Sequence, residues 1–65
     1  MTRLEKLDYM KNFYPRLFAI LEQNVPFVVE NTGFMTDKDA EECNIYIAKY
    51  CMERNNPQLL NFLRL

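Results

Sequence analysis

The side chains of this chain that could do chemistry are two cysteines and a group of carboxylates. Cys43 and Cys51 lie eight positions apart, and the chain contains no histidine. The missing histidine removes the commonest general base, the Cys–His nucleophile arrangement and the commonest metal ligand. Two cysteines at this spacing match no structural zinc pattern, which needs four nitrogen or sulfur ligands. We therefore expect no catalytic residue, no metal site and no cofactor.

The carboxylates gather in one short stretch at Asp37, Asp39, Glu41 and Glu42. The two aspartates have the spacing of the first ligands of a calcium loop, but the glycine and the later oxygen ligands are missing. The two glutamates are adjacent, so on a helix they face about 100° apart and form no dyad. The single glycine excludes a glycine-rich phosphate loop. The acids suit the positive end of a helix dipole, and we expect that the protein is not an enzyme.

These acids and both cysteines belong to one expected helix over residues 36–54. Thr36 is a suitable N-cap, and Asp39 stands where a capping box places its second side chain. Pro57 ends the run, because the residue before a proline avoids the α region.

The expected helix has two adjoining apolar sides. The first comprises Ala40, Cys43, Ile47, Tyr50 and Cys51, and the second comprises Ile45, Ala48 and Met52. Together they are wider than the stripe of roughly 100° that packs on one neighbour. Either the chain itself covers this helix on two sides, or part of the apolar arc meets another molecule.

The remaining elements are shorter. Thr2 and Glu5 form a capping-box pattern, so a helix starts at once. Pro15 divides it into one helix to about Asn12 and a second from Pro15; a single kinked helix over 3–23 is the alternative. Residues 25–29 have the composition of an extended linker or of one short strand.

After Pro57 come five large apolar residues in seven positions, which must pack into a groove and could be shared with a second copy. We expect a single all-α domain over residues 1–65 with three to four helices. Its parts are a long central helix at about 36–54, a first helix broken or kinked at Pro15, an extended 25–35 connection and a short C-terminal helix.

Composition narrows the class of protein further. The chain has 65 residues, a hydrophobic fraction of 49% and a net charge of −1. It has a packed but marginal core, no general attraction to nucleic acid and no apolar run of the roughly 18 residues that cross a membrane. The charged N-terminal residues do not form a signal peptide, and two cysteines without one indicate a reducing compartment. We expect a cytoplasmic protein with no membrane partner.

Nucleic-acid binding is the alternative function. Four basic residues alternate with aromatic ones near the N-terminus: Arg3, Lys6, Lys11 and Arg16, with Tyr9, Phe13 and Tyr14. Such a surface could hold phosphates and stack bases. However, the longest helix begins with four acids, which repel phosphate. We therefore do not expect a nucleic-acid partner.

Protein binding is the function that we expect. The marginal core, the wide apolar arc and the apolar C-terminus all favour association, and a homodimer is the first expectation. A self-sufficient monomeric bundle is the alternative. The anchor residues would be aromatic: Tyr9, Phe13, Tyr14, Tyr46, Tyr50 and Phe62. By size alone, the chain is typical of regulatory or accessory proteins of phages and other mobile elements.

Overall fold

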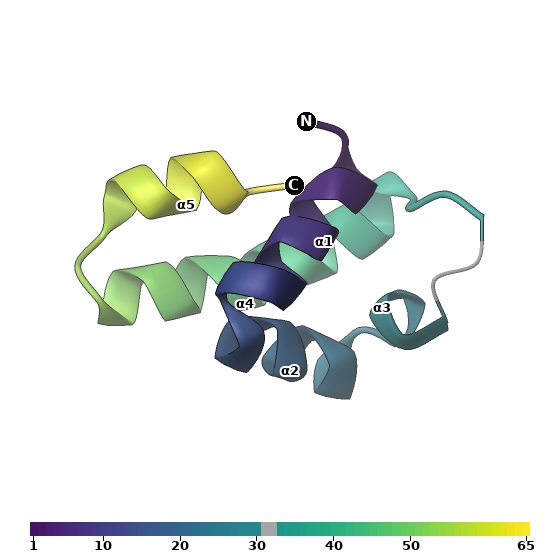
Figure 1. The fold of residues 1–65 in the computed structure, drawn as a ribbon, viewed down its shortest axis with the longest axis horizontal. Coiled ribbons are helices and arrows are strands. Elements are labelled where there is room, and N and C mark those ends of the chain that lie inside the picture. The colour runs from purple at the N-terminus through teal and green to yellow at the C-terminus, as the bar shows by residue number, and fades with distance from the viewer. Residues whose placement is uncertain (31–32) are drawn as a thin grey trace.

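The regular secondary structure in the described part of the chain consists of helices. A computed structural model describes residues 1–30 and 33–65, which form five helices (Figure 1). They are α1 (Arg3–Phe13), α2 (Pro15–Asn24), α3 (Pro26–Glu30), α4 (Asp37–Glu53) and α5 (Pro57–Leu63). The predicted all-α class is confirmed, with one helix more than expected.

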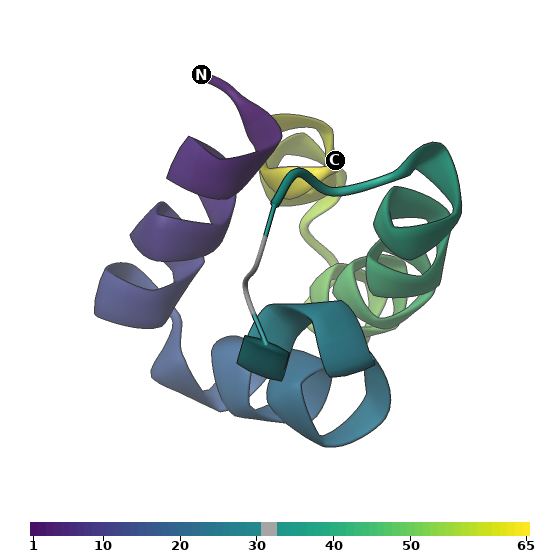
Figure 2. The same cartoon turned by 90° about the vertical axis from the view of Figure 1, so that its right-hand side faces the viewer.

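The helices surround a common interior, and Figure 2 shows their arrangement around it, seen from one end of the long axis. There α1 and α4 lie on opposite sides, α2 and α3 close one end, and α5 lies between α1 and α4 at the other. Every helix contributes at least one buried side chain. The core comprises Leu7, Met10, Leu17, Leu21, Val25, Val28, Met35, Ala40, Cys43, Ile47, Cys51 and Leu63. Among the described residues, none of the buried ones is polar or charged.

The long helix α4 begins and ends at the expected signals. The Asp39 amide donates to Thr36 Oγ1 at 3.1 Å, and the Thr36 amide donates to Asp39 Oδ2 at 3.2 Å, which completes the capping box. At the other end Asn55 has a φ of 53°, the left-handed region in which asparagine is among the few tolerated residues. The predicted helix over residues 36–54 is confirmed.

Pro15 separates two helices instead of kinking one. Tyr14 between them has φ −133° and ψ 62°, which is not helical, and Pro15 occupies the first position of α2. There the missing N–H of proline costs nothing, because the first amides of a helix have no partner within it. The capping box of α1 forms as predicted, and the hydrogen bond from the Thr2 amide lowers the pKa of the Glu5 carboxyl.

The prediction for residues 25–29 was wrong. Val25 is extended, but Pro26–Glu30 form the short helix α3. Val25 and Val28 are buried while Val29 is 62% exposed, and a spacing of three is that of a helix turn. The β preference of valine is weak enough for packing to override it. The rest of the expected 25–35 connection is non-helical at 33–35, and its residues 31–32 lie outside the described part.

Substitution of Ile47 tests the assignment of the buried face of α4. Ile47 is fully buried, so Ile47→Ala should lower the free energy of unfolding by about 2 to 5 kcal/mol. Ile45 lies two positions earlier on the same helix and is 66% exposed, so Ile45→Ala should change stability by only about 0.5 kcal/mol. Urea unfolding followed by circular dichroism measures both. Equal midpoints for the two variants would show that the buried face is assigned incorrectly.

Candidate protein-interaction surface

Three aromatic rings from α1 and α5 form an exposed group, which we call the aromatic surface: Tyr9, Phe13 and Phe62. The ring centroid of Tyr9 lies 4.7 Å from that of Phe13 and 5.3 Å from that of Phe62, the second pair edge to face. The side chain of Phe13 is 65% exposed and that of Phe62 is 46% exposed. Tyr9 and Phe13 meet because they are four positions apart on α1.

The ring contacts continue from the aromatic surface to α4. Tyr14 lies 6.2 Å from Tyr9 and 6.5 Å from Tyr50, measured between ring centroids. Five of the six predicted anchor residues therefore form one chain of contacts. The sixth, Tyr46, lies one helical turn before Tyr50 and lines a groove between α2 and α4. Of the six, only Phe13 and Phe62 are exposed, and the four tyrosines are half-buried.

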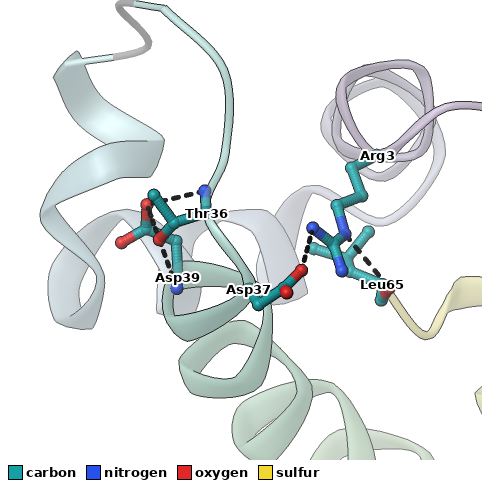
Figure 3. A network of polar contacts seen from close by, with 5 residues as sticks. All are labelled: Arg3, Thr36, Asp37, Asp39 and Leu65. Atoms are coloured by element: carbon teal, nitrogen blue, oxygen red, sulfur yellow. Dashed lines mark hydrogen bonds and ion pairs between the residues drawn. The ribbon is translucent and has the colours of Figure 1, made fainter.

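Hydrogen bonds to the C-terminal residues fix α5, and with it Phe62. Lys6 Nζ donates to the Arg64 carbonyl at 2.8 Å, and the Leu65 amide donates to Asn44 Oδ1 at 2.7 Å. Arg3 Nε donates to the Leu65 carbonyl at 3.4 Å, and Arg3 Nη1 lies 2.9 Å from Asp37 Oδ1 (Figure 3). The C-terminal tail thus joins α1 to α4, which holds Phe62 against Tyr9.

The four basic residues of the alternative function do not form one surface. Arg3 and Lys6 hold the C-terminal tail. Lys11 lines a hollow that also includes Glu22, whereas Arg16 lines the groove between α2 and α4. Two of the four cations are thus engaged by backbone carbonyls, and the other two lie in different hollows.

The chain covers only the first apolar side of α4. On the second side Ile45 is 66% exposed and Met52 is 69% exposed, with Ala48 half-buried between them. Met52 also borders an apolar hollow of about 280 Å³ together with Pro57 and Leu60. The chain itself therefore does not cover α4 on two sides, and part of the apolar arc is left exposed.

The sequence interpretation missed the groove between α2 and α4. Lys49 and Arg54 line it together with Tyr46 and Tyr50, and α2 contributes Arg16. Successive intervals of three, one and four positions separate Tyr46, Lys49, Tyr50 and Arg54, and this spacing was the available signal, because it places them on neighbouring turns at the end of α4. Nothing in the sequence alone assigns Arg16 to the same place, since that depends on how α2 packs against α4.

Comparison of this chain with protein-family models, curated proteins and solved structures finds no match. Across residues 1–30 and 33–65, no group of three or more cysteine, aspartate and glutamate side chains could hold a metal ion. No helix in those same ranges is long and apolar enough to cross a membrane. The features that remain as candidates for function are the aromatic surface, the uncovered side of α4 and the groove between α2 and α4.

The cysteines predict a pH dependence of stability. Both thiols are free and buried, and burial, followed by the Asp39 and Glu42 carboxylates, raises the pKa of Cys43 from 9.0 to about 11. The folded thiol keeps its proton in a range where the unfolded thiol loses it. This contribution to stability is therefore complete below pH 9.0 and declines as the pH rises to about 11.

The free energy of unfolding should accordingly fall over this pH range, and fall less steeply for Cys43→Ala. Urea unfolding at a series of pH values measures both slopes, and the comparison isolates the contribution of Cys43, because all other residues are common to both proteins. Equal slopes of the free energy of unfolding against pH for the two proteins would contradict the raised pKa of Cys43. At neutral pH, a thiol reagent should label neither cysteine until the protein unfolds, since buried protonated thiols are unreactive.

Proposed function

We propose that this protein acts by binding other proteins, a second copy of itself included. It would regulate a partner by occupying part of the partner's surface and not by catalysing a reaction. The supporting observation is the aromatic surface, where Phe13 and Phe62 are 65% and 46% exposed around Tyr9. Contiguous exposed apolar groups of this kind mark interaction sites on small proteins. Aromatic residues also contribute a large share of the binding energy in protein interfaces.

The aromatic surface is preformed, which favours binding further. Tyr9 is held by rings on both sides, and Phe62 is held by the hydrogen-bonded C-terminal tail. Side chains that are already ordered lose little conformational entropy when a partner covers them. The binding energy of the two phenylalanines is therefore not spent on ordering the surface.

A small regulatory or accessory protein, such as phages and other mobile elements encode, would act in this way. Occupancy requires no cofactor and no catalytic group. The free, buried thiols of Cys43 and Cys51 suit a reducing compartment, which supports a cytoplasmic location.

Nucleic-acid binding through Arg3, Lys6, Lys11 and Arg16 has weaker support. Affinity for nucleic acid depends on cations that are free to neutralise phosphates. Arg3 and Lys6 hold the C-terminal tail, so a nucleic acid would have to compete with those contacts. An electrophoretic shift of DNA or RNA at low salt that disappears steeply as salt rises would favour this alternative over protein binding.

Self-association through the aromatic surface can be measured by light scattering over a concentration series up to about 1 mM, where even weak dimers form. The average mass should rise toward that of a dimer, because two copies bury their exposed phenylalanines against each other. The double substitution Phe13→Ser and Phe62→Ser should keep the protein monomeric at all concentrations.

Phe34→Ser is the matched control, because Phe34 is 82% exposed but lies outside the aromatic surface, just before α4. This variant should associate as the wild type does. A wild type that stays monomeric throughout, or a control that loses association equally, would argue against self-association through Phe13 and Phe62. Circular dichroism of each variant establishes that it is folded.

A further inference from the structure

The groove between α2 and α4 combines positive charge with an apolar lining. It has a volume of about 430 Å³, and its side chains include Arg16 and Ile20 from α2 and Tyr46, Lys49, Tyr50 and Arg54 from α4 and its end. A space of this size accommodates one or more side chains of a ligand.

The charge of the groove differs in sign from that of the whole chain. The residues that line the groove include three cations, Arg16, Lys49 and Arg54, and one carboxylate, that of Glu53, whereas the chain carries a net charge of −1. Clefts with charges of one sign concentrate the electric field and attract ligands of the opposite sign. The ligand that the groove favours is therefore acidic.

Arg54 is already oriented for such a ligand. Its Nη1 donates to the Tyr50 carbonyl at 3.1 Å, and its Cζ lies 3.5 Å from the centroid of the Tyr50 ring. Stacking on the ring fixes the plane of the guanidinium, and the group has further N–H donors for a carboxylate. The ring and Ile20 provide apolar surface beside this charge.

We propose that this groove binds an acidic segment of a partner protein, in which aspartate or glutamate flanks an aliphatic or aromatic side chain. The carboxylates would contact Arg16, Lys49 and Arg54, and the apolar side chain would lie against Tyr46, Tyr50 and Ile20. The inference rests on the proposed protein-binding function and names the chemistry of the partner. An acidic peptide is favoured over a nucleic acid, because a short segment needs only the three cations of the groove, whereas a longer polyanion extends beyond the groove toward the acids in the first turns of α4.

A library of random short peptides displayed on particles tests this inference without knowledge of the natural partner. The full chain is immobilised, and bound peptides are selected at low salt and sequenced. Selected peptides should be enriched in aspartate and glutamate next to leucine, isoleucine, phenylalanine or tyrosine. A synthetic peptide of the selected sequence, labelled with a fluorophore, then gives the affinity by anisotropy.

Two double variants with the same change in net charge distinguish binding in the groove from attraction of the peptide to the charge of the whole protein. Arg16→Glu with Lys49→Glu reverses two cations of the groove and should weaken binding of the synthetic peptide about tenfold or more. Lys11→Glu with Lys38→Glu reverses two exposed cations outside the groove and should leave the affinity nearly unchanged. Equal losses in both variants, or selection of neutral or basic peptides, would overturn the inference.

Changes in the NMR chemical shifts of the backbone amides, measured as the peptide is added, locate the binding site. Shifts centred on Tyr46, Lys49 and Tyr50 support the groove. Shifts centred on Tyr9, Phe13 and Phe62 would overturn the groove assignment while supporting the proposed function. A different result would be that no acidic peptide is selected, that single-stranded oligothymidylate binds the protein, and that the variant Arg16→Glu with Lys49→Glu no longer binds it. The groove would then bind nucleic acid, and the inference would fail. The light-scattering test of Phe13 and Phe62 is independent of all these outcomes.

Discussion

The fold depends on the burial of one narrow face of α4. Ala40, Cys43, Ile47 and Cys51 are at most 2% exposed and repeat at the spacing of a helical stripe. Three of the four are small, so neighbouring helices can approach α4 closely. The two thiols act there as small apolar groups, in agreement with their raised pKa values.

The same constraint explains why apolar groups remain at the surface. Once α2 and α5 pack on the first side of α4, little chain is left to cover Ile45 and Met52 or the rings of Phe13 and Phe62. Small domains bury a smaller fraction of their surface than large ones, so such groups are expected. What is less expected is their grouping, since Phe13 and Phe62 both contact Tyr9. Grouped exposed rings favour a partner, whereas isolated ones need no explanation.

Local signals in the sequence were sufficient for the starts of α1 and α4. Thr36 with Asp39, and Thr2 with Glu5, form hydrogen bonds within three positions, so tertiary structure has little influence on them. The error at residues 26–30 has the opposite origin. A five-residue helix has almost no stability of its own. Its presence follows from the burial of Val28 in the core, which no local pattern predicts.

The candidate site was predictable only in part, for a related reason. Aromatic residue type alone indicated the anchor residues, but their contacts depend on the return of the C-terminal tail to α1. The basic residues Arg3 and Lys6 belonged to the alternative nucleic-acid surface, and in the structure they hold that tail through backbone carbonyls. The tertiary structure decides which cations are engaged by backbone carbonyls and which are available to a ligand. The groove likewise exists only because α2 brings Arg16 beside Lys49 and Arg54.

The aromatic surface and the groove differ in chemistry, yet they are joined by the contacts of Tyr14 with Tyr9 and Tyr50. In the proposed function, apolar burial at Phe13 and Phe62 would contribute affinity with little selectivity, because many apolar surfaces fit such a site. Charge at Arg16, Lys49 and Arg54 would contribute selectivity, because a basic partner is repelled. A partner with an apolar patch beside an acidic segment would satisfy both surfaces. A second copy of this chain would engage the aromatic surface alone and leave the groove open to a different protein.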